Sequence, residues 1–133
     1  MLHRSVIPSL LLGLVAILVA VGCSTSAGSD TATVSLVSAA DAVVMLEDRT
    51  IVDVRTPEEY ATGHVVGAVN IPVEADDFAE RISELDPDEP YLVYCRSGRR
   101  SAIAADQMAA AGFSDIVDAG ALEDLARAGA PIE

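Results

Sequence analysis

The sequence contains no lysine and no tryptophan, and only two of its 133 residues are cysteines. Its eight basic residues, all arginines, are outnumbered by 21 acidic residues, which gives a formal net charge of -13 at pH 7. A protein that binds duplex nucleic acid needs a basic face to neutralise phosphates, so this composition argues against a nucleic-acid partner. Two cysteines cannot build a disulfide scaffold, and an aromatic content of 4% leaves few rings for stacking on bases or sugars.

The hydrophobic content is high for so acidic a chain. Hydrophobic residues make up 51% of the sequence, which is enough to bury a core and argues against an intrinsically disordered chain. A length of 133 residues corresponds to about one domain of ordinary size.

The first residues have the pattern of a secretory signal peptide. Residues 10–21 carry no polar side chain, and this run is shorter than the about 20 residues of a membrane-spanning helix. The run closes with Ala20-Val21-Gly22-Cys23, which resembles the bacterial lipobox. The resemblance implies that residues 1–22 are removed and that Cys23 is lipidated, which would hold the protein on a membrane on the extracytoplasmic side. A short uncleaved anchor is the alternative.

Residues 24–33 contain only Ser, Thr, Ala, Gly and Asp. Such a composition cannot bury enough surface to order itself, so residues 23–33 are expected to act as a flexible tether. The folded domain is expected to span residues 34–133.

Short apolar segments alternate with helical patterns along this domain. The sequence predicts strands at residues 34–36, 50–54, 68–71, 91–94 and 115–117, and helices at 38–47, from 56 onward, 75–84, 100–111 and 121–128. Ser38 and Thr56 have the pattern of helix N-caps, and Pro57 suits a first helical position. The alternation predicts an α/β domain with a central, mainly parallel sheet flanked by helices. Ligands bind at the carboxyl ends of the strands in such sheets, and Cys95 follows one of these ends directly.

One short segment breaks the acidic average. Residues 95–100 read Cys95-Arg96-Ser97-Gly98-Arg99-Arg100 and place three arginines beside a cysteine at the predicted start of a helix. The helix dipole and the guanidinium groups both favour the thiolate, which is the nucleophilic form of cysteine. Backbone N–H groups in such a loop also point toward a bound anion, and Gly98 permits the tight turn that they need. The segment is therefore interpreted as an anion-binding loop around a nucleophile.

The loop resembles the active-site loop of single-domain rhodaneses, the sulfurtransferases, in which four residues separate a Cys from an Arg. The flanking sequence shares the resemblance: Asp53-Val54-Arg55, the segment 63–72 and the segment 112–120 are similar to motifs of that family. Together these segments cover nearly all of residues 34–133. The resemblance implies a small rhodanese-like domain, carried here as a bacterial lipoprotein.

The length of the loop argues against a cysteine-dependent phosphatase. Those enzymes have five residues between the Cys and the Arg, and the residue at that spacing here is Ser101. Because Arg100 comes one position earlier, phosphatase and arsenate reductase activities are disfavoured.

The resemblance implies a two-step transfer of sulfur. The Cys95 thiolate takes the outer sulfur of a small anionic donor such as thiosulfate, and it holds this sulfur as a persulfide until a thiol or cyanide accepts it. In this account the N–H groups of the loop stabilise the persulfide, and no cofactor is required. The substrate-binding residues would be Arg96, Ser97, Gly98, Arg99 and Arg100.

Three further residues are expected to support the site structurally. Asp53 and Arg55 should pair with each other, or with Glu58 or Glu59, because buried charges need partners. His64 is expected to form a hydrogen bond within its Gly-His turn. No further Cys or His has metal-ligand spacing, so no metal site is predicted.

A second class of function is compatible with the same loop. A non-catalytic module could use it to carry sulfur, to sense an anion or to bind a protein. A stable added sulfur on Cys95 with negligible turnover would distinguish the carrier from the enzyme.

Overall fold

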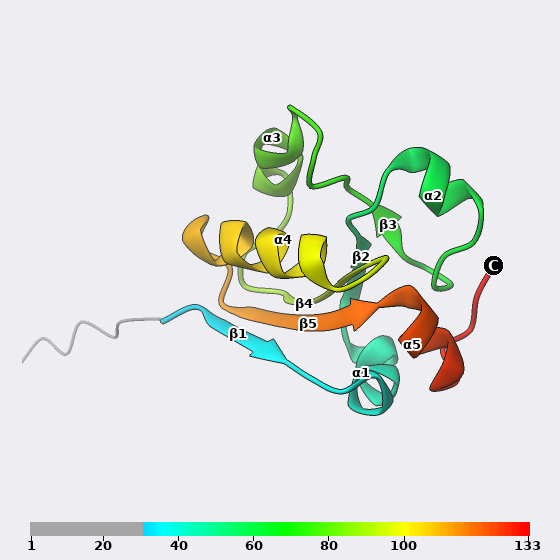
Figure 1. The fold of residues 1–133 in the computed structure, drawn as a ribbon. Coiled ribbons are helices and arrows are strands. Elements are labelled where there is room, and N and C mark those ends of the chain that lie inside the picture. The colour runs from blue at the N-terminus through cyan, green and yellow to red at the C-terminus, as the bar shows by residue number, and fades with distance from the viewer. Residues whose placement is uncertain (1–30) are drawn as a thin grey trace, which may run out of the picture.

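A five-stranded sheet organises residues 31–133, the part of the chain that the computed structural model describes (Figure 1). The predicted signal peptide, Cys23 and the predicted tether up to residue 30 lie outside the described residues. The sheet has the order β1-β5-β4-β2-β3, and every neighbouring pair is parallel. The strands are β1 (Thr33–Leu36), β2 (Thr50–Asp53), β3 (Val69–Asn70), β4 (Pro90–Cys95) and β5 (Asp115–Ala121). The predicted α/β fold with a parallel sheet is confirmed.

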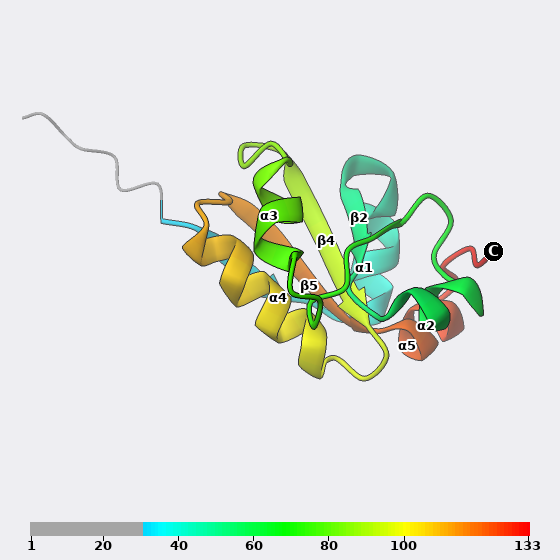
Figure 2. The same cartoon turned by 90° about the horizontal axis from the view of Figure 1, so that it is seen from above.

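Helices cover both faces of this sheet (Figures 1 and 2). Helices α3 (Phe78–Ser83) and α4 (Arg99–Ala110) pack on one face, where Phe78, Ile82 and Met108 join the core. Helices α1 (Ala39–Met45) and α5 (Leu122–Arg127) pack on the other face through Ala42 and Leu125. A 3₁₀ helix, η1 (Leu46–Asp48), continues α1, and α2 (Pro57–Ala61) follows the carboxyl end of β2.

The side chains of β4 alternate between the two faces. Tyr91, Val93 and Cys95 belong to the core under α3 and α4, whereas Leu92 and Tyr94 belong to the core under α1 and α5. Strand geometry sends successive side chains to opposite faces, so the thiol of Cys95 lies on the α4 side of the sheet. The hydroxyl-bearing ring of Tyr94 lies on the other side.

Local capping sets the starts of α1 and α2. The Ser38 side chain accepts a hydrogen bond from the Asp41 amide, and Thr56 forms a complete capping box with Glu59. Both caps satisfy amide groups that the first turn of a helix leaves unpaired. Pro57 occupies the start of α2, as its fixed φ angle favours.

Most element boundaries differ by a residue or two from the sequence prediction, and three differences bear on the fold. Helix α3 begins at Phe78 rather than near residue 75, because residues 72–78 form turns that bring Phe78 into the core. Strand β5 extends past residue 117 to Ala121, which pairs with Cys95 beyond an irregularity in β4. Strand β1 begins at Thr33, one residue before the predicted start of the domain. No helix among residues 31–133 has the length and apolar character needed to cross a membrane.

Candidate active site

Cys95 ends β4 and begins the loop that leads into α4. Its side chain is fully buried, and its Sγ accepts a hydrogen bond of 3.0 Å from the Gly98 amide. Gly98 has a φ angle of +90°, which L side chains rarely adopt. This conformation turns the loop back on itself, so that the Gly98 N–H points at the sulfur three residues earlier. A negative charge on that sulfur would therefore meet a backbone donor.

Ser101, in the first turn of α4, contacts both the Cys95 thiol and the Gly98 carbonyl. Its hydroxyl is buried, donates to the Gly98 carbonyl at 3.1 Å, and lies 3.7 Å from the Cys95 Sγ as an acceptor of the thiol hydrogen. The sequence singled out this residue only as the position of the phosphatase arginine. Its contact with the thiol follows from the helical turn between Gly98 and Ser101, which brings position 101 back over the loop.

Arg100 is held by carboxylates. Its guanidinium donates to both oxygens of Glu59 at 2.7 and 2.8 Å and lies 3.4 Å from a Glu74 oxygen. The hydrogen bonds that Arg100 donates to Glu59 raise the pKa of Arg100, and together with the bond from the Thr56 amide they lower the pKa of Glu59 from 4.5 to about 2. Arg100 thus ties the start of α4 to α2, and much of its charge is compensated.

The other two arginines of the loop are exposed. Arg96 and Arg99 both face solvent, and neither forms an ion pair with any of residues 31–133. Ser97, between them, is exposed as well. Their guanidinium groups are therefore available to a dissolved anion.

A buried network lies at the end of β2, next to β4. Asp53 is fully buried and accepts from the Arg55 guanidinium at 2.6 Å and from the Tyr94 hydroxyl at 2.7 Å. Burial and the bond to Asp53 raise the pKa of Tyr94, so its hydroxyl stays protonated as a donor. Burial opposes the charge on Arg55, but the bonds and charge of Asp53 outweigh it and raise the pKa of that group. Asp53 and Arg55 thus pair with each other, one of the arrangements that the sequence allows.

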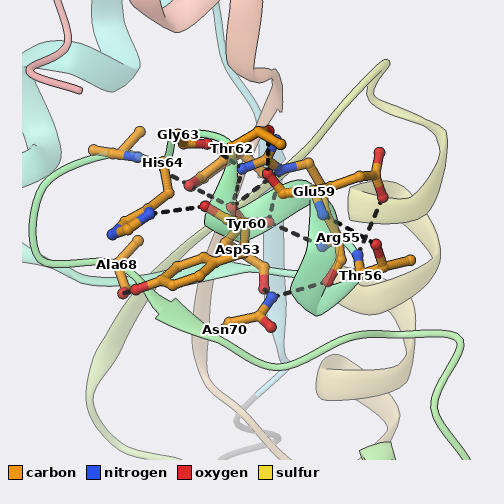
Figure 3. A network of polar contacts seen from close by, with 12 residues as sticks. Asp53, Arg55, Thr56, Glu59, Tyr60, Thr62, Gly63, His64, Ala68 and Asn70 are labelled. Carbon is orange, nitrogen blue, oxygen red and sulfur yellow. Dashed lines mark hydrogen bonds and ion pairs between the residues drawn. The ribbon is translucent and has the colours of Figure 1, made fainter. Parts of the chain in front are cut away.

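The same network fixes the loop that follows α2 (Figure 3). Arg55 donates to the Gly63 carbonyl at 2.7 Å, and the Asn70 side chain donates to the carbonyls of Asp53 and Arg55 at 3.0 and 2.8 Å. These bonds connect the end of β2 to residues 63–70. The site therefore rests on a framework with its polar groups paired.

His64 is engaged within this loop rather than with the thiol. Its ring stacks on Tyr60 with centroids 3.7 Å apart, and its Nδ1 lies 3.0 Å from the Tyr60 carbonyl oxygen (Figure 3). Its Nε2 lies 3.5 Å from a Glu133 carboxylate oxygen. These contacts give His64 a structural role, in which it connects the loop after α2 to Tyr60 and Glu133. Among residues 31–133, no group of three or more His, Cys, Asp or Glu side chains is arranged to hold a metal ion.

Two hollows flank the loop, and Ser97 borders both. The α5 hollow, of about 610 Å³, lies between the loop and α5 and is bordered by Arg55, Arg96, Ser97, Leu122, Asp124 and Ile132, among others. The α4 hollow, of about 330 Å³, is bordered by Val73, Glu74, Ser97, Arg99, Arg100 and Ile103. Either hollow brings a ligand next to the loop that covers Cys95.

Comparisons with known proteins point to one family. The model of the rhodanese-like domain matches residues 38–120. The thiosulfate sulfurtransferase PspE of Escherichia coli is 40% identical over 77 residues, which cover 56% of this chain and 72% of that protein.

Solved structures agree with this match. The crystal structure of a rhodanese-related protein from Thermoplasma volcanium has a TM-score of 0.66 at 28% identity, covering 74% of this chain and 97% of that one. A structure of a rhodanese with anions from E. coli has a TM-score of 0.54 at 32% identity, covering 64% of this chain and 96% of that one.

Proposed function

The chain belongs to the rhodanese-like family, and from that premise we propose that it transfers sulfane sulfur from a small anionic donor to a thiol or cyanide through a persulfide on Cys95. The observation that carries the proposal is the hydrogen bond of 3.0 Å from the Gly98 amide to the Cys95 Sγ. A backbone donor held in this way favours a negatively charged sulfur. The names of the sulfurtransferase and rhodanese relatives support the same chemistry.

The first step loads the enzyme. The Cys95 thiolate attacks the outer sulfur of thiosulfate, and a new S–S bond forms. The original S–S bond of the donor breaks, and sulfite leaves with its electron pair. Cys95 then carries a persulfide anion, whose charge the N–H groups of the loop stabilise.

The second step unloads it. Cyanide or a thiolate attacks the outer sulfur of the persulfide, the S–S bond to Cys95 breaks, and the electron pair returns to the Cys95 thiolate. The products are thiocyanate or the persulfide of the acceptor. The two half-reactions share one covalent intermediate, so the kinetics should be ping-pong.

The three arginines of the loop have two different roles in this scheme. Arg96 and Arg99 are exposed and attract anionic substrates, whereas Arg100, held by Glu59, shapes the loop. Because Cys95 is fully buried, the structure around it must shift before a donor touches the sulfur.

The test compares residues 31–133 or the full chain with its Cys95→Ser variant. Thiosulfate and cyanide should yield thiocyanate, and thiosulfate alone should add the mass of one sulfur atom to the protein. The Ser variant should do neither, and full activity in it would overturn the proposal. A stable sulfur adduct without turnover would instead identify a sulfur carrier.

We also propose that a lipid on Cys23 anchors the domain to a membrane on the extracytoplasmic side. The support is the sequence Ala20-Val21-Gly22-Cys23 after a short apolar run. Metabolic labelling with a radioactive fatty acid should mark the wild-type protein and not a Cys23→Ala variant. Labelling of both, or of neither, would contradict the lipid anchor.

A further inference from the structure

The α5 hollow carries charges of both signs. Arg96 borders it from the cysteine loop and Arg55 from the end of β2, whereas Glu123 and Asp124 border it from α5. Ile132 and Leu122 add apolar surface between them. Arg55 is already paired with Asp53, so a ligand that fills this space meets one guanidinium group without an ion pair among residues 31–133, that of Arg96, together with two carboxylates and a short apolar stretch. A ligand that carries charge of one sign can pair with only one of these two kinds of group.

We propose that the α5 hollow is the acceptor subsite and that it selects thiols that carry both an ammonium and a carboxylate group, as amino-acid and small peptide thiols do. The carboxylate of the acceptor would face Arg96, its ammonium would face Asp124 and Glu123, and its carbon skeleton would lie on Leu122. This inference rests on the proposed sulfurtransferase function and specifies the second substrate.

The donor fits the α4 hollow better. Thiosulfate is a small dianion, and in the α5 hollow it would face the carboxylates of Glu123 and Asp124. The α4 hollow is smaller, about 330 against about 610 Å³, and it has one carboxylate, that of Glu74, which is paired with Arg100. It also offers Arg99, which has no ion-pair partner among residues 31–133. Both hollows border Ser97 and neither is lined by the fully buried Cys95, so a shift of the loop brings a ligand in either hollow to the same sulfur.

Arg127 forms ion pairs with the two carboxylates that would bind an ammonium group of the acceptor. Its guanidinium pairs with Asp124 at 2.7 Å and with Glu123, and all three side chains are more than half exposed. Exposed ion pairs of this kind contribute little free energy, so a ligand ammonium can compete with Arg127. Removing Arg127 should therefore strengthen binding of the acceptor, an effect that a merely structural role of this residue would not produce.

The experiment measures kcat/KM for four acceptor thiols after loading with thiosulfate. Cysteine carries both charges, cysteamine only the ammonium, 3-mercaptopropionate only the carboxylate and 2-mercaptoethanol neither. Within each variant every value is divided by that for 2-mercaptoethanol, so effects on loading and on the intrinsic reactivity of Cys95 cancel.

The variants should change these ratios in opposite directions. Arg127→Gln should raise the cysteine and cysteamine ratios about threefold, and the Glu123→Gln/Asp124→Asn double variant should lower both about threefold, as expected for exposed charge contacts. Arg96→Gln should lower the ratio for 3-mercaptopropionate. Arg99→Gln is the matched control, because it makes the same change on the other side of Ser97 and should leave all three ratios unchanged.

Mass spectrometry of the protein after incubation with thiosulfate distinguishes failure of the proposed function from failure of the acceptor subsite. If thiosulfate adds no sulfur to Cys95, the proposed function itself fails. If the persulfide forms but the ratios do not respond to Arg127→Gln or to the double variant, the acceptor subsite is wrong and the sulfurtransferase function stands. Ratios that respond to Arg99→Gln instead would place the acceptor in the α4 hollow and overturn the inference.

Discussion

The arginines around the loop fall into two groups that differ in burial and partners. Arg55 and Arg100 have side chains that are 5% and 18% exposed, and each is paired with a carboxylate, Asp53 and Glu59 respectively. Arg96 and Arg99 are exposed and form no ion pair within residues 31–133. The paired arginines hold the shape of the site, and the unpaired ones supply charge to a ligand. Counting arginines along residues 95–100 therefore overstates the charge that a donor meets.

Asp53→Asn should have the largest effect on stability, because it leaves the buried Arg55 without a countercharge. Breaking a buried pair by removing one partner costs about 3–5 kcal/mol of unfolding free energy, and urea denaturation would measure it. Asp115→Asn is the control, since it breaks a bidentate pair with Arg49 in which Asp115 is 47% exposed. An equal cost for both variants would show that burial does not distinguish these arginines.

Glu59→Gln should have an intermediate effect. It removes the charge that holds Arg100, while the Gln side chain can still complete the capping box with Thr56. Loss of a charge-assisted hydrogen bond at a partly exposed site should cost about 1–2 kcal/mol of unfolding free energy. Glu58→Gln, one position earlier on the same helix and exposed, should cost much less. Equal stabilities of the two variants would move Arg100 into the unpaired group.

The stabilisation that Glu59 provides should depend on pH, because folding changes the pKa of its carboxyl group. Pairing with Arg100, together with the hydrogen bond from the Thr56 amide, lowers this pKa from 4.5 to about 2 in the folded protein, so the charged form is favoured by folding. The stabilisation is fully present above pH 4.5 and is lost as the pH falls toward about 2. Urea denaturation should give a difference in unfolding free energy between the wild type and Glu59→Gln. This difference should be constant near neutral pH and should become smaller below pH 4.5. In an Arg100→Gln background the narrowing should become smaller, because only the hydrogen bonds with Thr56 then lower the pKa of Glu59.

Arg96→Gln and Arg99→Gln should have the smallest effect on stability, within about 0.5 kcal/mol, because neither side chain forms an ion pair within residues 31–133. Arg99→Gln should instead act on the donor, with KM for thiosulfate rising about two- to fivefold, as for exposed charge contacts. Arg96→Gln should act on acceptors that carry a carboxylate. Added salt should raise the wild-type KM in the same direction by screening the guanidinium groups. A loss of stability comparable to that of Glu59→Gln would show that Arg96 and Arg99 also have a structural role.

Local patterns were sufficient to predict most elements of the fold. The caps at Ser38 and Thr56 use contacts within three residues, so the sequence around them determines the start of each helix. The end of β5 was not predictable in the same way. Residues 118–121 extend the strand because they pair with β4, whose residue 95 lies opposite Ala121.

The same limit applies to the site. Cys95 and Gly98 lie in one contiguous loop, so a sequence pattern is enough to single them out. The partner of Arg100 could not be read from the sequence, because Glu59 lies 41 residues away and several other acidic residues were equally plausible partners. Nor could the burial of the thiol, which depends on how the loop folds over the end of β4.

The contacts of the site bring together two distant parts of the chain, and this has a consequence for folding kinetics. The bond from Tyr94 to Asp53 and those from Arg100 to Glu59 each span 41 residues, the same separation as the residues paired between β2 and β4. Closing a loop of that length costs chain entropy before any of these bonds forms. Pairing of β2 with β4 therefore assembles the carboxylates and the cysteine loop in one event. During refolding, recovery of the reactive cysteine should coincide with docking of these two central strands.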